Sequence, residues 1–166
     1  SGRFDISDPK KAIFDWPGVY IKAKFEGTSC TLRLKDGNNF YNIRVDDQSV
    51  QVLKTDTATI YIIAEGLEDT AHTILIEKRT ESNIGSGEFL GFILDEGKSL
   101  LQLDSIPERR IEFIGNSITC GYGVEGKSAE ESFKPETENA ALSYASLISK
   151  SLNADYSLVA FSVKGV

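Results

Sequence analysis

Residues 109–123 read RRIEFIGNSITCGYG, and this stretch decides the fold of the second half of the chain. Its apolar part, residues 111–115, is typical of a strand that is buried on both faces of a parallel sheet. The apolar run stops at Gly115 and gives way to small and polar residues, beginning with Asn116 and Ser117. Ligands bind beyond the carboxyl ends of the strands in open parallel sheets. Ser117 therefore stands where a binding or catalytic group is expected.

A helix and a second strand follow. In residues 138–153 the apolar positions Ala141, Ala145, Ile148 and Leu152 recur at helical spacing, which predicts one buried face. Residues 156–162, YSLVAFS, form another apolar run. Strand, helix and strand predict a βαβ unit with a parallel sheet. Two strands and one helix leave a sheet edge and a face uncovered, so we expect the sequence to end partway through its second domain.

The first hundred residues have a different periodicity. Short runs of strand-forming residues alternate between apolar and polar, with turn residues spaced as in sandwiches and barrels. The turn at residues 36–39, DGNN, lies between two such runs and predicts a hairpin. No helix of three turns is expected here. Pro107 and the charged residues beside it mark a connection, so we predict an all-β sandwich over residues 1–106 and an α/β domain from residue 107 to 166.

Composition limits the partners and cofactors. A formal net charge of −7 opposes binding to nucleic acid or to an anionic membrane, and a neutral or weakly polar partner fits better. No apolar stretch has the roughly 20 residues that span a bilayer. Cys30 and Cys120 lack metal-site spacing, so we expect two free thiols and no metal. The oligomeric state is not encoded in any recognisable pattern.

Ser117 has two interpretations from its position alone. Serine is among the best helix N-cap residues, and on spacing the cap is the commoner role. A serine at a sharp turn can also be a nucleophile whose own N–H donates to an oxyanion. Gly115 would permit the turn, and Gly121 and Gly123 would keep the following loop free of bulk.

The block IEFIGNSITCGYG, residues 111–123, resembles the SGNH (GDSL-type) hydrolases, specifically carbohydrate esterase family two. Residues 138–166 are similar to the helix and second strand of that family. Upstream, FDWPGVYIKAKFEGTS (residues 14–29) and HTILIEKRTES (residues 72–82) resemble parts of its N-terminal domain. The resemblance implies a jelly-roll β-sandwich followed by the first part of a flavodoxin-like SGNH hydrolase domain.

The resemblance also implies roles for individual residues. Ser117 would be the nucleophile, and its backbone N–H one oxyanion donor. The family's second donor is a glycine that follows a serine in an SGxG turn. Here the turn reads Ser162-Val163-Lys164-Gly165, so Val163 occupies the place of the glycine. Because a β-branched residue resists positive φ, either Val163 donates from an ordinary conformation, or Gly165 donates instead, or the oxyanion hole is impaired.

Three further residues have expected roles near the serine. Asn116 stands where the broader family commonly has Asp, and it would shape the turn with Gly115. An amide keeps hydrogen-bonding reach without charge, so Asn116 is not expected to be a base. Tyr122 and Phe133 are candidates for contacts with a sugar.

Other polar and aromatic residues are expected to be structural. The single histidine, His72, is interpreted as a strand residue with satisfied hydrogen bonds, so the chain lacks the base that a serine nucleophile needs. Trp16 is expected to pack in the core, although it could stack on a sugar. One cluster of acidic residues is interpreted as part of a solvated loop: Glu125, Glu130, Glu131, Glu136 and Glu138.

The resemblance implies an enzyme that removes O-acetyl groups from plant polysaccharides of the xylan or mannan type through an acetyl-serine intermediate. Such an enzyme needs no metal or organic cofactor, acts on acetylated polysaccharide or oligosaccharide, and is expected to be secreted, displayed on the cell surface or periplasmic. These 166 residues alone should lack proficient activity. The alternative is a non-catalytic carbohydrate-binding protein with a β-sandwich module. In a third interpretation, the sandwich serves only to support the active-site cleft from one side.

Overall fold

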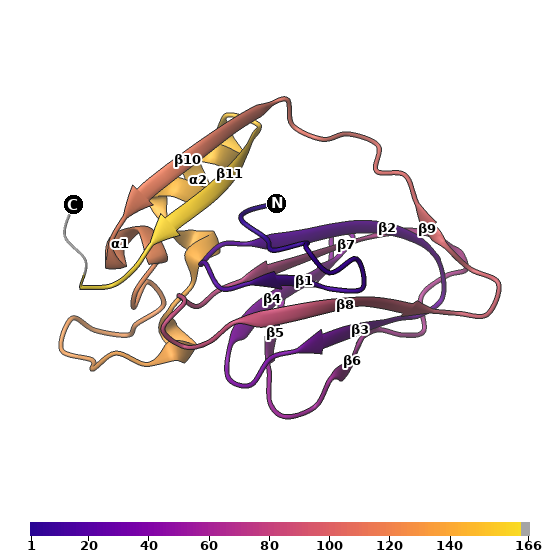
Figure 1. The fold of residues 1–166 in the computed structure, drawn as a ribbon, viewed down its shortest axis with the longest axis horizontal. Helices are drawn as coiled ribbons and strands as arrows, with labels where there is room; N and C mark the ends of the chain where they lie inside the picture. Colours follow the sequence, from indigo (N-terminus) through magenta and orange to yellow (C-terminus); the bar gives the residue numbers. More distant parts are fainter. Residues whose placement is uncertain (164–166) are drawn as a thin grey trace.

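The structure is a computed structural model that describes residues 1–163, and residues 1–106 form two antiparallel sheets without a helix (Figure 1). One sheet has the order β1-β8-β3-β6, and the other has the order β5-β4-β7-β2-β9. The first contains β1 (Ala12–Phe14), β8 (Gly87–Leu94), β3 (Cys30–Lys35) and β6 (Ile60–Ala64). The second contains β5 (Gln51–Lys54), β4 (Phe40–Val45), β7 (Thr70–Lys78), β2 (Tyr20–Gly27) and β9 (Leu100–Leu101). Strands β1 to β8 thus have the order of a jelly roll, and the predicted all-β sandwich is confirmed.

The predicted hairpin at residues 36–39 is wrong. Strand β3 pairs with β6 and β8, whereas β4 pairs with β5 and β7, so the turn crosses from one sheet to the other. The cause is Asp36, which is buried and accepts hydrogen bonds from Asn39 Nδ2 at 2.9 Å and from the Tyr41 hydroxyl. The inward carboxylate directs the chain across the sandwich instead of back along the same sheet.

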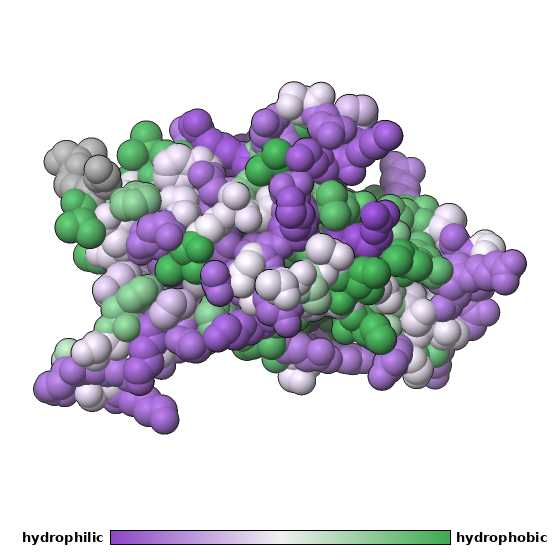
Figure 2. All heavy atoms as spheres, turned by 60° about the horizontal axis from the view of Figure 1, so that its bottom comes forward, coloured by the Kyte–Doolittle hydropathy of each residue, from purple (hydrophilic) through white to green (hydrophobic). Residues whose placement is uncertain are grey.

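The main core lies between the two sheets. Its buried side chains include Phe25, Leu32, Leu34, Ile74 and Ile76. On the outer surface, Ile60 and Ile62 of the edge strand β6 are more than half exposed, and Figure 2 shows hydrophobic side chains interspersed with polar ones over the sandwich.

The second part contains the predicted βαβ unit. Strands β10 (Arg109–Gly115) and β11 (Ala154–Ala160) pair in parallel, with Gly115 opposite Ala160. Between them lie α1 (Ser117–Cys120), the 3₁₀ helices η1 (Pro135–Thr137) and η2 (Ala140–Leu142), and α2 (Tyr144–Ser151). Within the described residues, no helix is long and apolar enough to cross a membrane.

The predicted apolar face of the helix is only partly correct. Ser143 caps α2 by accepting from Ser146 N, so Ala141 belongs to the separate helix η2. The buried residues of α2 are Ala145, Ser146 and Ser149, whereas Ile148 is 44% exposed. Leu152 follows the helix and is 48% exposed. Small residues permit close packing, and both serine hydroxyls bond to backbone carbonyls, so serine replaces apolar side chains on the inner face.

The two parts share a small second core. Tyr156 and Leu158 of β11 pack with Ala140 and Ala145, and Tyr20 of the sandwich joins this cluster. The rings of Tyr20 and Tyr156 lie 5.5 Å apart between centroids. The βαβ unit therefore packs directly on the edge of the sandwich near the start of β2.

Replacing Asp36 tests the crossing turn. We expect Asp36→Ala to lower the free energy of unfolding by about 2–4 kcal/mol, because it removes an acceptor from the buried Tyr41 hydroxyl and Asn39 amide. Urea unfolding followed by circular dichroism measures the change. Asp47→Ala, at an exposed position of another turn, is the control and should change stability by less than about 0.5 kcal/mol. Equal effects of the two changes would contradict this account.

Candidate functional site

Ser117 lies at the carboxyl edge of the parallel sheet. It is the first residue of α1, which follows β10. The side chain is half-buried. Within residues 1–163, neither the Ser117 hydroxyl nor its backbone N–H makes a hydrogen bond. A free hydroxyl and a free N–H on one residue are the two groups that a serine nucleophile needs.

The N-cap interpretation of Ser117 is wrong, because Asn116 is the cap. Asn116 has extended backbone angles, and its side-chain oxygen accepts from Ile118 N at 3.2 Å. Its carbonyl accepts from Thr119 N and Cys120 N. Asn116 thus caps α1, and the Ser117 hydroxyl takes no part in the cap.

Two glycines are required by close packing around this turn. A Cβ on Gly115 would lie 2.1 Å from Thr119 Oγ1, so β10 can pass under α1 only without a side chain there. Gly121 ends α1 with φ of 73°, and a Cβ would lie 2.3 Å from the Asn139 carbonyl. Asn139 N in turn donates to Gly121 O at 3.1 Å. The loop carrying Asn139 is therefore held against the end of α1.

The turn after β11 lies beside the turn after β10. Phe161 N donates to Gly115 O at 3.3 Å, and both strands end on the side where α1 lies (Figure 1). Val163 has φ of 66° and is 96% exposed. The expectation that Val163 could donate from an ordinary conformation is wrong, because the residue adopts the left-handed region that a glycine would favour. Gly165, the other predicted donor, lies outside the described residues.

The two candidate sugar-binding residues come together. The rings of Tyr122 and Phe133 stack on each other, with centroids 4.0 Å apart and planes 15° apart. Tyr122 is 44% exposed and lies just after Gly121, the C-cap of α1. The pair presents one composite aromatic surface rather than two separate platforms.

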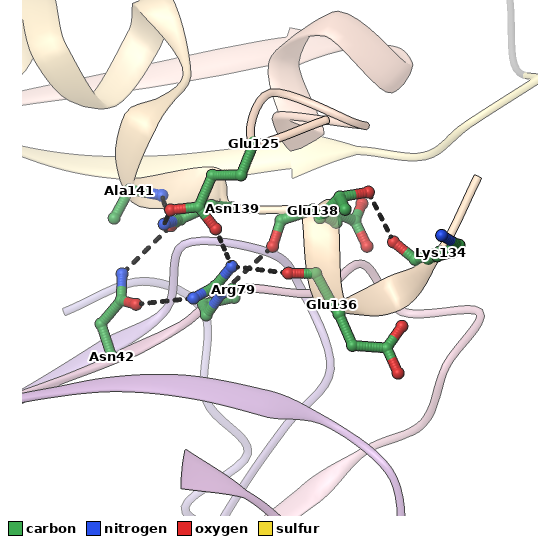
Figure 3. Close-up of polar contacts among 9 residues, drawn as sticks. Asn42, Arg79, Glu125, Lys134, Glu136, Glu138, Asn139 and Ala141 are labelled. Carbon is green, nitrogen blue, oxygen red and sulfur yellow. Dashed lines mark hydrogen bonds and ion pairs between the residues drawn. The ribbon is translucent and has the colours of Figure 1, made fainter. Parts of the chain in front are cut away.

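A run of buried charged residues at the end of β7 was not recognised in the sequence. Residues 77–81, EKRTE, are all less than 5% exposed. Arg79 donates to the carbonyls of Glu138 and Glu136 and pairs with the Glu125 carboxylate (Figure 3). Its own carbonyl accepts from Ala140 N at 3.0 Å. Arg79 thus joins the sandwich to three residues of the loop between α1 and α2 and to the start of η2.

The interpretation of the acidic cluster as part of a solvated loop is wrong for Glu138, whereas Glu125 is exposed although it pairs with a buried arginine. Glu138 is fully buried, and its backbone and side chain face the end of β7. Glu125 pairs with Arg79 and accepts from Asn139 Nδ2 at 3.1 Å. The tip of the loop, which contains Glu130, is exposed. A buried arginine required a carboxylate partner, and the sequence pattern did not reveal it.

Glu81, Cys120 and Glu138 form a buried cluster, with a ligand atom of each within 4.8 Å of the other two. Glu81 Oε2 accepts from Ser162 N at 2.6 Å and lies 3.9 Å from Cys120 Sγ.

Burial raises the pKa of Glu138 to about 8. Burial likewise lowers the pKa of Lys78, whose Nζ donates to the Thr80 carbonyl, to about 8. At neutral pH Glu138 is thus protonated, and it adds no negative charge to the buried cluster.

His72, Trp16 and the cysteines have the expected structural roles. His72 is buried in β7, where Nδ1 bonds to Asp46 Oδ2 at 2.7 Å and Nε2 to the Glu68 carbonyl. The hydrogen bond with Asp46 raises the pKa of His72. Trp16 packs against the main core, and both Cys30 and Cys120 are free and buried. Both ring nitrogens of His72 are therefore hydrogen-bonded within the sandwich.

Comparison with known proteins fits this architecture. The family model described as Carbohydrate esterase 2 N-terminal matches residues 1–103. The chain belongs to carbohydrate esterase family two. Distant structural neighbours support the fold of this family two chain: a salicylyl-acyltransferase, SsfX3 (15% identity, TM-score 0.60), and a GDSL-like lipase from Bacteroides ovatus (13%, TM-score 0.56).

Relatives of this family two chain are named as esterases. It is 39% identical over 168 residues to the cellulase/esterase CelE of Acetivibrio thermocellus, covering 100% of this chain and 20% of that protein. It is 36% identical to an acetylxylan esterase / glucomannan deacetylase of Cellvibrio japonicus, covering 96% and 44%. A Clostridium thermocellum family two esterase in complex with cellohexaose superposes with TM-score 0.92 at 38% identity, covering 99% and 51%. The chain thus spans less than half the length of these two curated relatives.

Val163 should carry backbone strain in this family two chain. We expect Val163→Gly to maintain or raise the free energy of unfolding, because a positive φ costs a β-branched residue about 1–3 kcal/mol while glycine adds less than about 1 kcal/mol of unfolded-state entropy. Val124→Gly is the control, since Val124 is exposed without a positive φ, and it should be destabilising. Thermal unfolding measures both, and an equal loss of stability in the two variants would show that Val163 is unstrained.

Glu138 should make stability depend on pH. Its pKa is raised from 4.5 to about 8, so the folded chain retains a proton that the unfolded chain releases. The free energy of unfolding should therefore fall as pH rises through this window, by up to about 1.4 kcal/mol per pH unit. Glu138→Gln should lack this fall and gain in relative stability between about pH 5 and pH 8. Urea unfolding of both proteins across that range measures it, and parallel curves would contradict it. The lowered pKa of Lys78 acts mainly above this window.

Proposed function

We propose that this chain supplies the nucleophile and the oxyanion hole of an enzyme that removes O-acetyl groups from plant polysaccharides of the xylan or mannan type. The observation that carries the proposal is Ser117, whose half-buried hydroxyl and backbone N–H have no hydrogen-bond partner within residues 1–163 at the carboxyl edge of a parallel sheet. The turn that contains Val163 follows the adjacent strand. The closeness of these two turns at one sheet edge supports the proposal that Ser117 is the nucleophile and that the second turn supplies another N–H donor.

In the proposed reaction, Ser117 Oγ attacks the acetyl carbonyl while a base takes the hydroxyl proton. The N–H groups of Ser117 and Val163 donate to the oxyanion of the tetrahedral intermediate. Collapse releases the sugar hydroxyl, which takes the proton from the base, and leaves acetyl-serine. The base then takes a proton from a water molecule that attacks the acetyl carbon. The bond between this carbon and Ser117 Oγ breaks, Oγ receives the proton from the base, and acetate is released. The base is not His72, which is held by Asp46 and Glu68, so we propose that it comes from residues beyond these 166.

The proposed substrate is an acetylated polysaccharide or oligosaccharide. Support comes from the relatives named acetylxylan esterase / glucomannan deacetylase and from the net charge of −7, which suits a neutral glycan better than a phosphate polymer. The stacked pair of Tyr122 and Phe133 beside α1 offers an aromatic surface of the kind that packs on sugar rings. A polymeric substrate of this kind would require secretion, surface display or a periplasmic location.

We also propose the domain division. The sandwich would comprise residues 1–106, with its last strand β9 ending at Leu101, and an SGNH hydrolase domain of flavodoxin-like fold would begin at residue 107, just before β10. In this proposal residues 107–166 are the first part of that domain. The complete reaction is therefore proposed for a longer polypeptide that contains the whole domain. The chain alone is expected to lack proficient activity.

A second candidate is a non-catalytic glycan-binding role. The relative from Clostridium thermocellum is described in complex with cellohexaose, and another structure at 33% identity is described as having divergent catalytic and non-catalytic binding functions. The strained Val163 at the second donor position would be consistent with a weak oxyanion hole. Binding of cello-oligosaccharide by a protein without esterase activity would favour this candidate.

Ser117→Ala tests the proposed reaction. The protein is produced from the longest reading frame that encodes these residues, and acetate release is measured with 4-nitrophenyl acetate and acetylated xylan. We expect Ser117→Ala to lower kcat by at least about 10³-fold, because no other group replaces the nucleophile. Ser128→Ala, at an exposed position of the acidic loop, is the matched control and should retain activity. Unchanged activity of Ser117→Ala would remove the nucleophile assignment.

A further inference from the structure

One carboxylate of the sandwich reaches the turn that follows β11. Glu81 and Ser162 are 81 residues apart in sequence, yet Ser162 N donates to Glu81 Oε2 at 2.6 Å. Both residues are buried, at 0% and 5% exposure. A hydrogen bond from a buried N–H to a carboxylate is among the stronger polar contacts in proteins. The sandwich therefore fixes the direction of this peptide group.

The peptide group that Glu81 fixes is one residue before the proposed oxyanion donor. The next N–H along the chain belongs to Val163, whose φ of 66° is unfavourable for valine. Strained backbone persists only where the surrounding contacts over-determine it. Two hydrogen bonds hold the backbone just before Val163: Glu81 accepts from the Ser162 N–H, and the Gly115 carbonyl accepts from the Phe161 N–H at 3.3 Å. Without the Glu81 carboxylate, only the hydrogen bond between Phe161 N–H and the Gly115 carbonyl would remain of these two.

The same carboxylate also faces the helix that begins with Ser117. Glu81 Oε2 lies 3.9 Å from the Sγ of Cys120, the last residue of α1. Glu81 is itself held in place, because its N–H donates to Glu138 Oε2 at 3.2 Å and its carbonyl accepts from Lys78 Nζ at 3.3 Å. One fixed oxygen thus touches both segments whose relative position defines the proposed oxyanion hole.

We propose that Glu81 is a positioning residue for the oxyanion hole, so that the sandwich sets the distance between the Ser117 and Val163 donors. This inference rests on the proposed esterase function. It assigns the sandwich a part in the chemistry, through a hydrogen-bond acceptor rather than through a contact with substrate. The acceptor, and not its charge alone, is the property that the turn requires.

Three substitutions separate the acceptor from the charge and from general stability. Glu81→Gln retains an oxygen that can accept from Ser162 N–H, whereas Glu81→Asp retains the charge but withdraws the acceptor by one methylene. Glu77→Gln is the matched control, because Glu77 is also buried at the end of β7 and joins α2 through Lys150 at 3.0 Å, away from the turn. All three are made in the protein from the longest reading frame, with kcat, KM and melting temperature measured on 4-nitrophenyl acetate.

We expect Glu81→Asp to lower kcat by about 10- to 100-fold with KM changed less than about threefold, because the lost interaction acts in the transition state. Glu81→Gln should retain kcat within about fivefold, and Glu77→Gln should lower the melting temperature without changing kcat. Unchanged kcat in Glu81→Asp, or equal loss in Glu77→Gln and Glu81→Asp, would overturn the inference. Ser117→Ala in the same assay distinguishes the two failures, since activity that survives it overturns the esterase proposal itself.

Discussion

The end of β7 places five polar or charged side chains in the interior, and each must find a partner there. An unpaired polar group in the interior costs several times the net gain of a hydrogen bond, and an unpaired charge costs more. Arg79 satisfies this requirement with the carbonyls and carboxylate of the loop between α1 and α2, and Glu77 does so with Lys150 of α2. Glu81 takes the Ser162 N–H. The βαβ unit is consequently located by the polar requirements of a sandwich strand as much as by the small apolar cluster of Tyr20, Tyr156 and Leu158.

This arrangement explains why the neighbourhood of Ser117 is ordered without a contribution from the serine hydroxyl, although the Ser117 carbonyl accepts from Tyr122 N at 3.0 Å. Asn116 supplies the cap of α1, and Gly121 and Asn139 join its end to the next segment. The hydroxyl of Ser117 has no structural bond to lose within the described chain. A nucleophile needs this freedom, because a hydroxyl that satisfies a cap is unavailable to a base.

The parts of the fold that could be predicted from the sequence are those governed by local periodicity. Alternation in residues such as those of β2 and β3 predicted the sandwich, and the apolar runs of β10 and β11 predicted a parallel pair. The crossing at Asp36 could not be predicted, because turn chemistry does not specify whether the next strand joins the same sheet. The buried face of α2 was missed because serines occupy it, with hydroxyls bonded to carbonyls of Ala140 and Ala145.

The candidate site was predictable only where a motif carried it. Ser117, Asn116 and Gly115 lie in one contiguous block, and their arrangement follows from it. The segment EKRTE has the composition of a solvated surface turn, and its burial depends on partners about 45 to 80 residues away in sequence, which no local pattern reveals. Val163 was recognised as unusual from its type, whereas its left-handed conformation is a property of the folded turn.

The interior position of Arg79 and Glu81 has a consequence for how such proteins can be recombined. An accessory module joined by a flexible linker can be exchanged for another without harm to its neighbour. Here the sandwich supplies hydrogen-bond partners to buried groups of the adjoining unit. Joining residues 107–163 to a foreign module would leave the Glu138 side chain and the Ser162 N–H without their partner, Glu81. Exchange of the sandwich alone would therefore destabilise the βαβ unit.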